Sequence, residues 1–182
     1  IGLAMRREIR FAGFGGQGII LAGLITGRAA ALHDGKEAIV TQSYGPEARG
    51  GACSAQLVLD DRPIDYPMVT HPDVLVVISQ EAAQKYMTGL VDDGQVLIDE
   101  GLVELPEHVL WRVSKIPATA IAEQLGNRMA ANVVMLGFFT AVTGAVSRKA
   151  MEAAIKASVR ERFIALNMKA FEAGYSYPRQ EG

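Results

Sequence analysis

Two glycine-rich stretches carry the residues whose types and spacing could do chemistry. In the first, "GFGGQG" at 13–18, Gly13, Gly15 and Gly18 are spaced as G-x-G-x-x-G between a short apolar run and a longer helical pattern. Glycines at such a point let the backbone turn tightly and approach a ligand, and the N–H groups at a helix start attract anions. The stretch is consistent with contact to a phosphate, contact to a partner, or only close packing of a strand on a helix. No Lys precedes a Ser or Thr after the glycines, so this is not a P-loop.

The same spacing is also used by dinucleotide-binding proteins, which need a second feature. An acidic residue closes their next strand and holds the ribose hydroxyls. Here the next strand, "EAIVTQ", closes with Gln42, and Asp34 lies before that strand instead. A free-standing NAD(P)- or flavin-binding oxidoreductase of Rossmann type is therefore the alternative hypothesis and not the leading one.

The second stretch, "SYGPEARGGACS" at 43–54, is more elaborate than a turn between strands requires. Pro46 fixes the backbone, while the glycines around it permit conformations that a side chain would forbid. Arg49 offers a planar fork that binds a phosphate or a partner's carboxylate, with Glu47 orienting it. A solvated Glu47–Arg49 pair and a general-base role for Glu47 are the alternatives. We expect Cys53 to be a small buried side chain, and a reactive thiol is the alternative.

The pattern of apolar residues predicts the elements that hold these stretches. The run "DVLVVIS" at 73–79 is continuous, as in a central parallel strand buried on both faces. Further strands are expected at 8–13, 37–42, 55–59, 95–99 and 108–113, and helices at 17–32, 81–90 and, with breaks near 126 and 147, from 117 to 174. We expect an α/β fold: a mostly parallel central sheet flanked by helices, a Rossmann-like three-layer sandwich with a helical C-terminal third. One domain over 1–182 is predicted, with its core at about 8–146 and C-terminal helices at about 147–174.

Open α/β sheets place their ligands at the carboxyl edge of the strands. If the sheet is parallel at the second strand, the two glycine stretches leave their strands at the same edge and are neighbours. No catalytic or metal-binding residue is predicted. The predicted binding residues are Gly15, Gly16, Gln17, Gly18, Tyr44, Gly45, Pro46, Glu47, Arg49, Gly50 and Gly51.

Composition narrows the class of protein further. The 182 residues have a formal net charge of −2, which gives nucleic-acid binding little support. The single cysteine forms no internal disulfide and holds neither zinc nor an iron–sulfur cluster alone, so a reducing cytoplasm is the expected compartment. No uninterrupted apolar run approaches the roughly 20 residues of a membrane span.

Together with "PDVLVVISQEA" at 72–82, the two glycine stretches resemble the gamma subunit of 2-oxoacid:ferredoxin oxidoreductases, the family of the pyruvate, 2-oxoisovalerate and 2-oxoglutarate enzymes. The resemblance runs from about Ile9 to Gly144, and its most specific part is the G-P-E-x-R-G-G run. A weaker similarity continues in "GNRMAANVVMLG" at 126–137, at the start of a long helix.

The resemblance implies a complex that oxidatively decarboxylates a 2-oxoacid, joins the acyl group to coenzyme A and reduces ferredoxin. It implies that thiamine diphosphate, Mg and the iron–sulfur clusters belong to other subunits, and that this chain alone binds no cofactor and is inactive. The chain would pack on the alpha and beta subunits, and on a ferredoxin-like delta subunit where one exists, near the coenzyme A site. An interaction module whose glycine loops only shape a protein interface is a third hypothesis. No residue selects among the possible 2-oxoacids.

Overall fold

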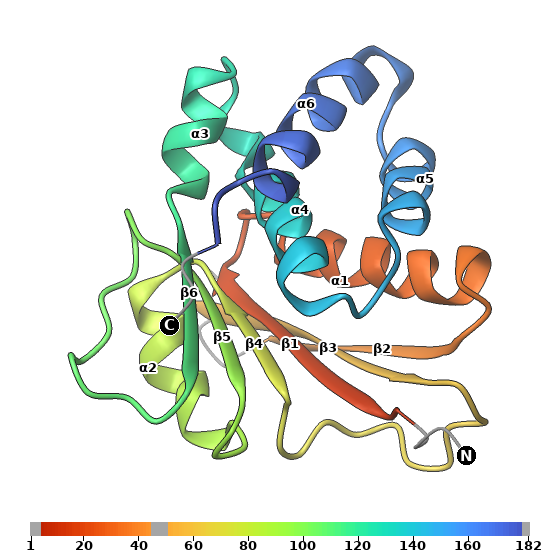
Figure 1. Cartoon of the computed structure of the whole chain (residues 1–182), viewed down its shortest axis with the longest axis vertical. Coiled ribbons are helices and arrows are strands. Elements are labelled where there is room, and N and C mark those ends of the chain that lie inside the picture. Colours follow the sequence, from red (N-terminus) through yellow and green to blue (C-terminus); the bar gives the residue numbers. More distant parts are fainter. Residues whose placement is uncertain (1–4, 45–50, 180–182) are drawn as a thin grey trace.

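The computed structural model describes residues 5–44 and 51–179. Its centre is a six-stranded sheet in the order β2-β3-β1-β4-β5-β6 (Figure 1). The strands are β1 (Arg7–Phe14), β2 (Glu37–Tyr44), β3 (Ala52–Asp60), β4 (Val74–Val77), β5 (Gln95–Asp99) and β6 (Arg112–Ile116).

One half of the sheet is parallel. β1 pairs with β4, β4 with β5 and β5 with β6, all in the same direction. All four residues of β4 are buried, as expected for a strand covered by helices on both faces. The predicted α/β fold with a mostly parallel sheet is confirmed.

The other half is an antiparallel hairpin. β3 pairs antiparallel with both β1 and β2, and it separates the two. β2 therefore runs in the same direction as β1 without pairing with it. The condition of a parallel sheet at this point does not hold, but the direction of β2 still brings its carboxyl end to the edge where β1 ends.

Helices cover the two faces unequally (Figure 1). Four helices lie on one face: α1 (Ile19–Arg28), α4 (Ala131–Thr143), α5 (Arg148–Ser158) and α6 (Ile164–Tyr175). The first of them, α1, continues as a π-helical turn to His33. The other face carries α2 (Gln80–Tyr86), and α3 (Ala118–Gln124) follows β6. The larger core lies under α1 and α4, where the Phe11 and Phe139 rings meet edge to face with centroids 5.2 Å apart. The smaller core lies between the sheet and α2.

Some predicted boundaries shift. Ser147 caps α5 as predicted, its hydroxyl accepting a hydrogen bond from the Ala150 N–H. Residues 108–111 are not a strand, because β6 begins only at Arg112. The last helix does not run on from Val159: the backbone is extended at Val159 and Arg160, and a short 3₁₀ turn at Glu161–Phe163 precedes α6.

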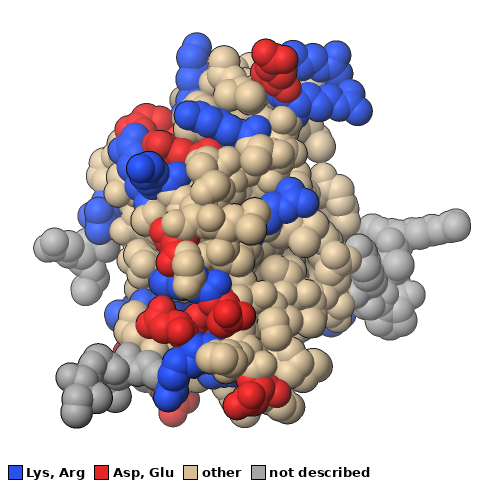
Figure 2. Space-filling view, turned by 90° about the vertical axis from the view of Figure 1, so that its right-hand side faces the viewer, with Lys and Arg blue, Asp and Glu red and all other residues tan. Residues whose placement is uncertain are grey.

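The surface carries no large region of one charge on the face in Figure 2, where side chains of both signs are interspersed. Within residues 5–44 and 51–179, no helix has the length and apolar character needed to cross a membrane.

Candidate functional site at the carboxyl edge of the sheet

The end of β1 and the loop that follows it require glycine at three positions for reasons inside the chain. Gly16 and Gly18 have φ angles of 89° and 75°, in the left-handed region that favours glycine. Gly13 is buried, and a Cβ there would lie 2.6 Å from Gln17 Oε1 and 2.9 Å from Ile78 Cγ1. These glycines let β1 turn into α1 and pack closely against β4.

Gly15 differs from its neighbours. Gly15 is exposed and its φ is not positive, and no described atom lies within 4 Å of a Cβ placed on it. The described part of the chain therefore gives no steric reason for glycine at this position. Its backbone is left open to whatever approaches this edge.

The side chain of Gln17 joins two strands. Its Oε1 accepts a hydrogen bond from the Phe14 N–H over 2.6 Å, and its Nε2 donates to the Ile78 carbonyl over 3.0 Å. The Gln17 backbone N–H also donates to Phe14 O over 3.2 Å. The two side-chain bonds of Gln17, a predicted binding residue, thus hold the ends of β1 and β4 together.

The hairpin brings the second stretch to the same edge. Tyr44 at the end of β2 is opposite Cys53, and Ala52 at the start of β3 is opposite Phe14 at the end of β1. Half-buried Gly51 leads directly into β3. Of the predicted binding residues, Gly45, Pro46, Glu47, Arg49 and Gly50 lie outside the described residues.

A cleft of about 280 Å³ opens beside the glycine loop. One wall is formed by Gly15, Gly16 and Gln17, and the remaining lining residues are Ile78, Thr119, Arg128, Met129 and Ala131. The Arg128 guanidinium lies 3.3 Å from the Glu123 carboxylate, and both side chains are more than half exposed. This exposed ion pair is weak, so Arg128 remains available to an anionic group.

A second groove of about 360 Å³ adjoins the first and is shared by Gly16 and Met129. None of its lining residues is charged, and Leu21, Met129 and Phe163 are exposed by 38%, 71% and 37%. Asn132, which lies on α4 in this groove, donates from Nδ2 to the Gly18 carbonyl over 3.3 Å. The carboxyl edge thus presents a cleft that contains Arg128 beside an uncharged groove.

Thr119, Arg128 and Met129 were not among the predicted site residues. Arg128 and Met129 belong to the "GNRMAAN" stretch, whose similarity to the family is weak. Asn127 acts there as a cap, its Oδ1 accepting from the Met129 N–H over 2.9 Å. The connection from α3 to α4 had to be placed at the carboxyl edge before these residues could be recognised.

The surroundings of Cys53 do not favour a reactive thiol. Its residue is only 6% exposed, and burial raises the pKa of its thiol above the usual value. The thiol is therefore protonated near neutral pH, and a protonated thiol is a poor nucleophile. Among the described residues, no group of three His, Cys, Asp or Glu side chains is arranged to hold a metal ion.

The topology does not favour a dinucleotide site. In a dinucleotide-binding half-sheet the second strand lies beside the first and carries the acidic residue for the ribose. Here antiparallel β3 occupies that position, and β2 is one strand further away. Among the described residues, Ala52, which has no carboxylate, lies opposite Phe14 at the end of β1.

Known proteins similar to this chain agree with the resemblance. Residues 8–177 match the family described as pyruvate ferredoxin/flavodoxin oxidoreductase. The chain is 52% identical over 180 residues to the 2-oxoglutarate synthase subunit KorC of Methanocaldococcus jannaschii, covering 97% of this chain and 96% of that protein. The keto/oxoacid ferredoxin oxidoreductase gamma subunit from Geobacter sulfurreducens has the same fold, with a TM-score of 0.87 and 42% identity over 94% of this chain and 95% of that one.

A third protein shows the fold within a longer chain. The 2-oxoglutarate:ferredoxin oxidoreductase from Magnetococcus marinus, solved with 2-oxoglutarate, coenzyme A and succinyl-CoA bound, matches with a TM-score of 0.84 at 23% identity, over 93% of this chain and 30% of that chain. The full-length matches and the shared fold identify the chain as a gamma subunit belonging to the 2-oxoacid:ferredoxin oxidoreductase family.

Proposed function

We propose that, in a complex that oxidatively decarboxylates 2-oxoglutarate, this gamma subunit uses its carboxyl edge to complete the coenzyme A site against a catalytic subunit. The choice of 2-oxoglutarate follows the 52% identity to a 2-oxoglutarate synthase subunit. Coenzyme A follows from the Magnetococcus enzyme, whose structure contains it.

Gly15 is the observation that carries the proposal. Gly13, Gly16 and Gly18 are explained by packing or by positive φ, whereas Gly15 has open space and an ordinary φ. A glycine without an internal reason is accounted for when a ligand or a partner backbone approaches closely. The neighbouring cleft is lined by Gly15, Gly16 and Arg128.

Charge supports an anionic ligand at this edge. Coenzyme A carries phosphates, which bind well to an arginine fork and to N–H groups at a helix start. Arg128 lies in the cleft, and α1 begins directly after Gly18. Arg49, in the segment between Tyr44 and Gly51, is proposed as a second phosphate ligand on the grounds of sequence.

The remaining chemistry is assigned to other subunits. We infer that the alpha and beta subunits, with a delta subunit where the complex has one, carry thiamine diphosphate, Mg and the iron–sulfur clusters, since this chain has one cysteine. On this assignment the isolated gamma subunit has no activity of its own. A cytoplasmic location remains a prediction.

The test is Gly15→Ala in the assembled complex, with Gly89→Ala as the matched control. A Cβ at Gly89 meets only ordinary contacts, at 3.7 Å or more, and its φ is not positive. Gly89 adjoins Thr70 and lies toward the opposite edge of the sheet. We expect Gly15→Ala to raise the KM for coenzyme A roughly tenfold, equivalent to losing one good contact. Gly15→Ala should leave the KM for 2-oxoglutarate unchanged, and Gly89→Ala should leave both KM values unchanged.

Arg128→Gln and Arg49→Ala extend the test to charge. Both should raise the KM for coenzyme A, with Arg62→Ala, in the turn after β3, as the control. If Gly15→Ala lowers the yield of complex in size-exclusion chromatography but leaves the KM for coenzyme A unchanged, the edge is a protein interface only. If neither quantity changes, the proposal is wrong.

A further inference from the structure

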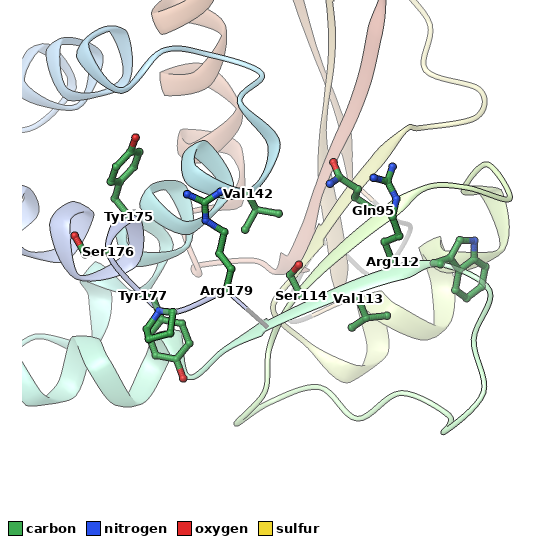
Figure 3. Close-up of a pocket in the computed structure, with 11 residues that line it drawn as sticks. Gln95, Arg112, Val113, Ser114, Val142, Tyr175, Ser176, Tyr177 and Arg179 are labelled. Atoms are coloured by element: carbon green, nitrogen blue, oxygen red, sulfur yellow. The ribbon is translucent and has the colours of Figure 1, made fainter. Parts of the chain in front are cut away.

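The edge strand β6 lies along a cleft that the proposed coenzyme A site does not use. The cleft has a volume of about 770 Å³ and runs between β6 and the segment Tyr175–Arg179 at the end of α6 (Figure 3). It is lined by Trp111, Arg112, Val113 and Ser114 from β6 and the residue before it, with Gln95 beside them on β5. The other edge strand, β2, leads into residues outside the described part of the chain.

The outer edge of β6 presents backbone hydrogen-bonding groups. Arg112 N–H donates to Gly94 O over 3.0 Å, and Ile116 O accepts from Glu100 N–H over 3.0 Å, so these residues face β5. Alternate residues of a parallel ladder face the same neighbour, which directs the N–H and C=O of Val113 and Lys115 outward. Neither amide has a hydrogen-bond partner on the outer side among the described residues. Such a row of groups is a template for another strand.

Side chains of β6 alternate between its two faces. Arg112 and Ser114 project to one side and Val113 to the other in Figure 3. Trp111 and Val113 pack against the core under α2, and Trp111 also lines a second cleft of about 520 Å³ on that side. Apart from Glu104 at its rim, this second cleft is uncharged, and it includes Met87, Leu105, Pro106 and Val109.

The first cleft is basic in contrast. Arg112 and Arg179 both line it, and their guanidinium groups extend to the same side of β6 (Figure 3). Arg112 donates from its guanidinium to the Asp93 carbonyl over 3.1 Å, but its ion pair with the Asp93 carboxylate is loose, at 3.7 Å between side chains that are 63% and 94% exposed. Arg179 has no ion pair with a described residue. An acidic side chain on this face would therefore meet two available cations.

We propose that the outer edge of β6 binds an extended segment of another protein chain as an added strand, with acidic side chains alternating with apolar ones. Side chains of a strand point to opposite faces with a period of two residues, so one set enters the basic cleft and the other the apolar cleft. The main-chain groups of Val113 and Lys115 supply the hydrogen bonds. At about 3.3 Å per residue, the five residues of β6 extend over roughly 16 Å and accommodate a segment of similar length.

The test uses the full chain and a capped synthetic peptide of alternating Glu and Val residues. Trp111 is the only tryptophan in the sequence, so its fluorescence reports binding at β6 directly. We expect a saturable fluorescence change, and slower hydrogen exchange at the Val113 and Lys115 amides. A peptide of alternating Lys and Val should bind the chain at least about tenfold more weakly, because it cannot form the two ion pairs with Arg112 and Arg179.

Two variations separate strand addition from other forms of binding. In the double variant Arg112→Glu and Arg179→Glu, the preference should reverse to the Lys peptide. N-methylation of one alternate set of peptide amides should abolish binding, while methylation of the other set should leave it intact. Binding that survives both methylations, or no binding by any peptide, overturns the proposal.

Two other occupants of the edge would also overturn it. One is a second copy of this chain, seen as a concentration-dependent dimer that the peptide dissociates. The other is the chain's own end, seen as peptide binding only by a variant that stops after Arg179.

Discussion

Asn132 on α4 occupies the space that a side chain at Gly18 would need. Its Nδ2 donates to the Gly18 carbonyl over 3.3 Å, and a Cβ on Gly18 would overlap the same nitrogen. Asn132 is only 7% exposed, although it lies on the helix rather than in the loop. The contact fixes the start of α1 against α4 and so sets the position of the glycine loop.

Gly18→Ala should destabilise the chain for two reasons. The φ of 75° costs an L-residue about 1–2 kcal/mol, and displacing the Asn132 amide costs about 1 kcal/mol more. Asn132→Ala alone should cost about 1 kcal/mol. In urea unfolding, the double variant should lose less than the sum of the single losses, because both remove the same hydrogen bond. Additive losses would show that the two residues do not interact.

Gln17→Ala should lower the free energy of unfolding by about 1–3 kcal/mol, because it leaves the Phe14 N–H and the Ile78 carbonyl without their partner. Gln80 is the matched control. It makes the same pair of bonds, to Glu104 N–H and O, but at an exposed site, so Gln80→Ala should cost much less. Equal losses in the two variants would contradict the bridging role of Gln17.

Gln17→Glu adds a dependence on pH. The carboxylate still accepts from Phe14 N–H, but its second oxygen faces the Ile78 carbonyl and repels it. The protonated acid can donate there, so folding should raise the pKa of the introduced group above its unfolded value. The variant should therefore be closer to the wild type in mild acid and lose stability as pH rises to neutral, measured by urea unfolding at both.

The sequence was sufficient to predict the sheet, because continuous apolar runs are local signals. The ends of the two glycine stretches meet, but through the antiparallel hairpin and not through the parallel sheet on which the prediction depended. The antiparallel hairpin was also predictable: residues 45–51 are too few for the crossover of a dozen or more residues that parallel neighbours need. The bridging role of Gln17 was not predictable from the sequence, since the Ile78 carbonyl that accepts its hydrogen bond is near only because β4 pairs with β1. Arg128 reaches the cleft for a similar reason, through the placement of the connection between α3 and α4.

Gly137 and Gly174 set the distance between α4 and α6. A Cβ on Gly137 would overlap the Phe171 carbonyl oxygen, and one on Gly174 would overlap that of Val134. Backbone atoms cannot swing aside, so either substitution to Ala must separate the helices. Alanine gains up to about 1 kcal/mol of helix propensity, but overpacking should cost about 3 kcal/mol, so both variants should be destabilised.

Gly89→Ala controls for the loss of glycine itself, since a Cβ there meets no atom closer than 3.7 Å. Thermal unfolding should show a clear fall in Tm for Gly137→Ala and Gly174→Ala and almost none for Gly89→Ala. A Tm equal to that of the wild type in either helix variant would mean that the helices are not in backbone contact.

Cys53 should react slowly with a thiol reagent in the folded chain. Burial raises the pKa of its thiol, so the thiolate fraction at any pH below that pKa is smaller than for a free cysteine. The rate of modification should therefore be far below that of a free cysteine near neutral pH, and it should keep rising into the alkaline range. The measurement is the rate of absorbance change with a chromogenic disulfide over a series of pH values.

The unfolded chain in denaturant is the control for Cys53, because unfolding exposes the thiol to the reagent and returns its pKa to the usual value. Cys53→Ser tests the packing role separately. The hydroxyl would be buried opposite Gly13 and Tyr44, at a site that is 6% exposed, and should cost about 1–3 kcal/mol. Fast modification of the folded chain near neutral pH, combined with no loss of stability in Cys53→Ser, would restore the reactive-thiol interpretation.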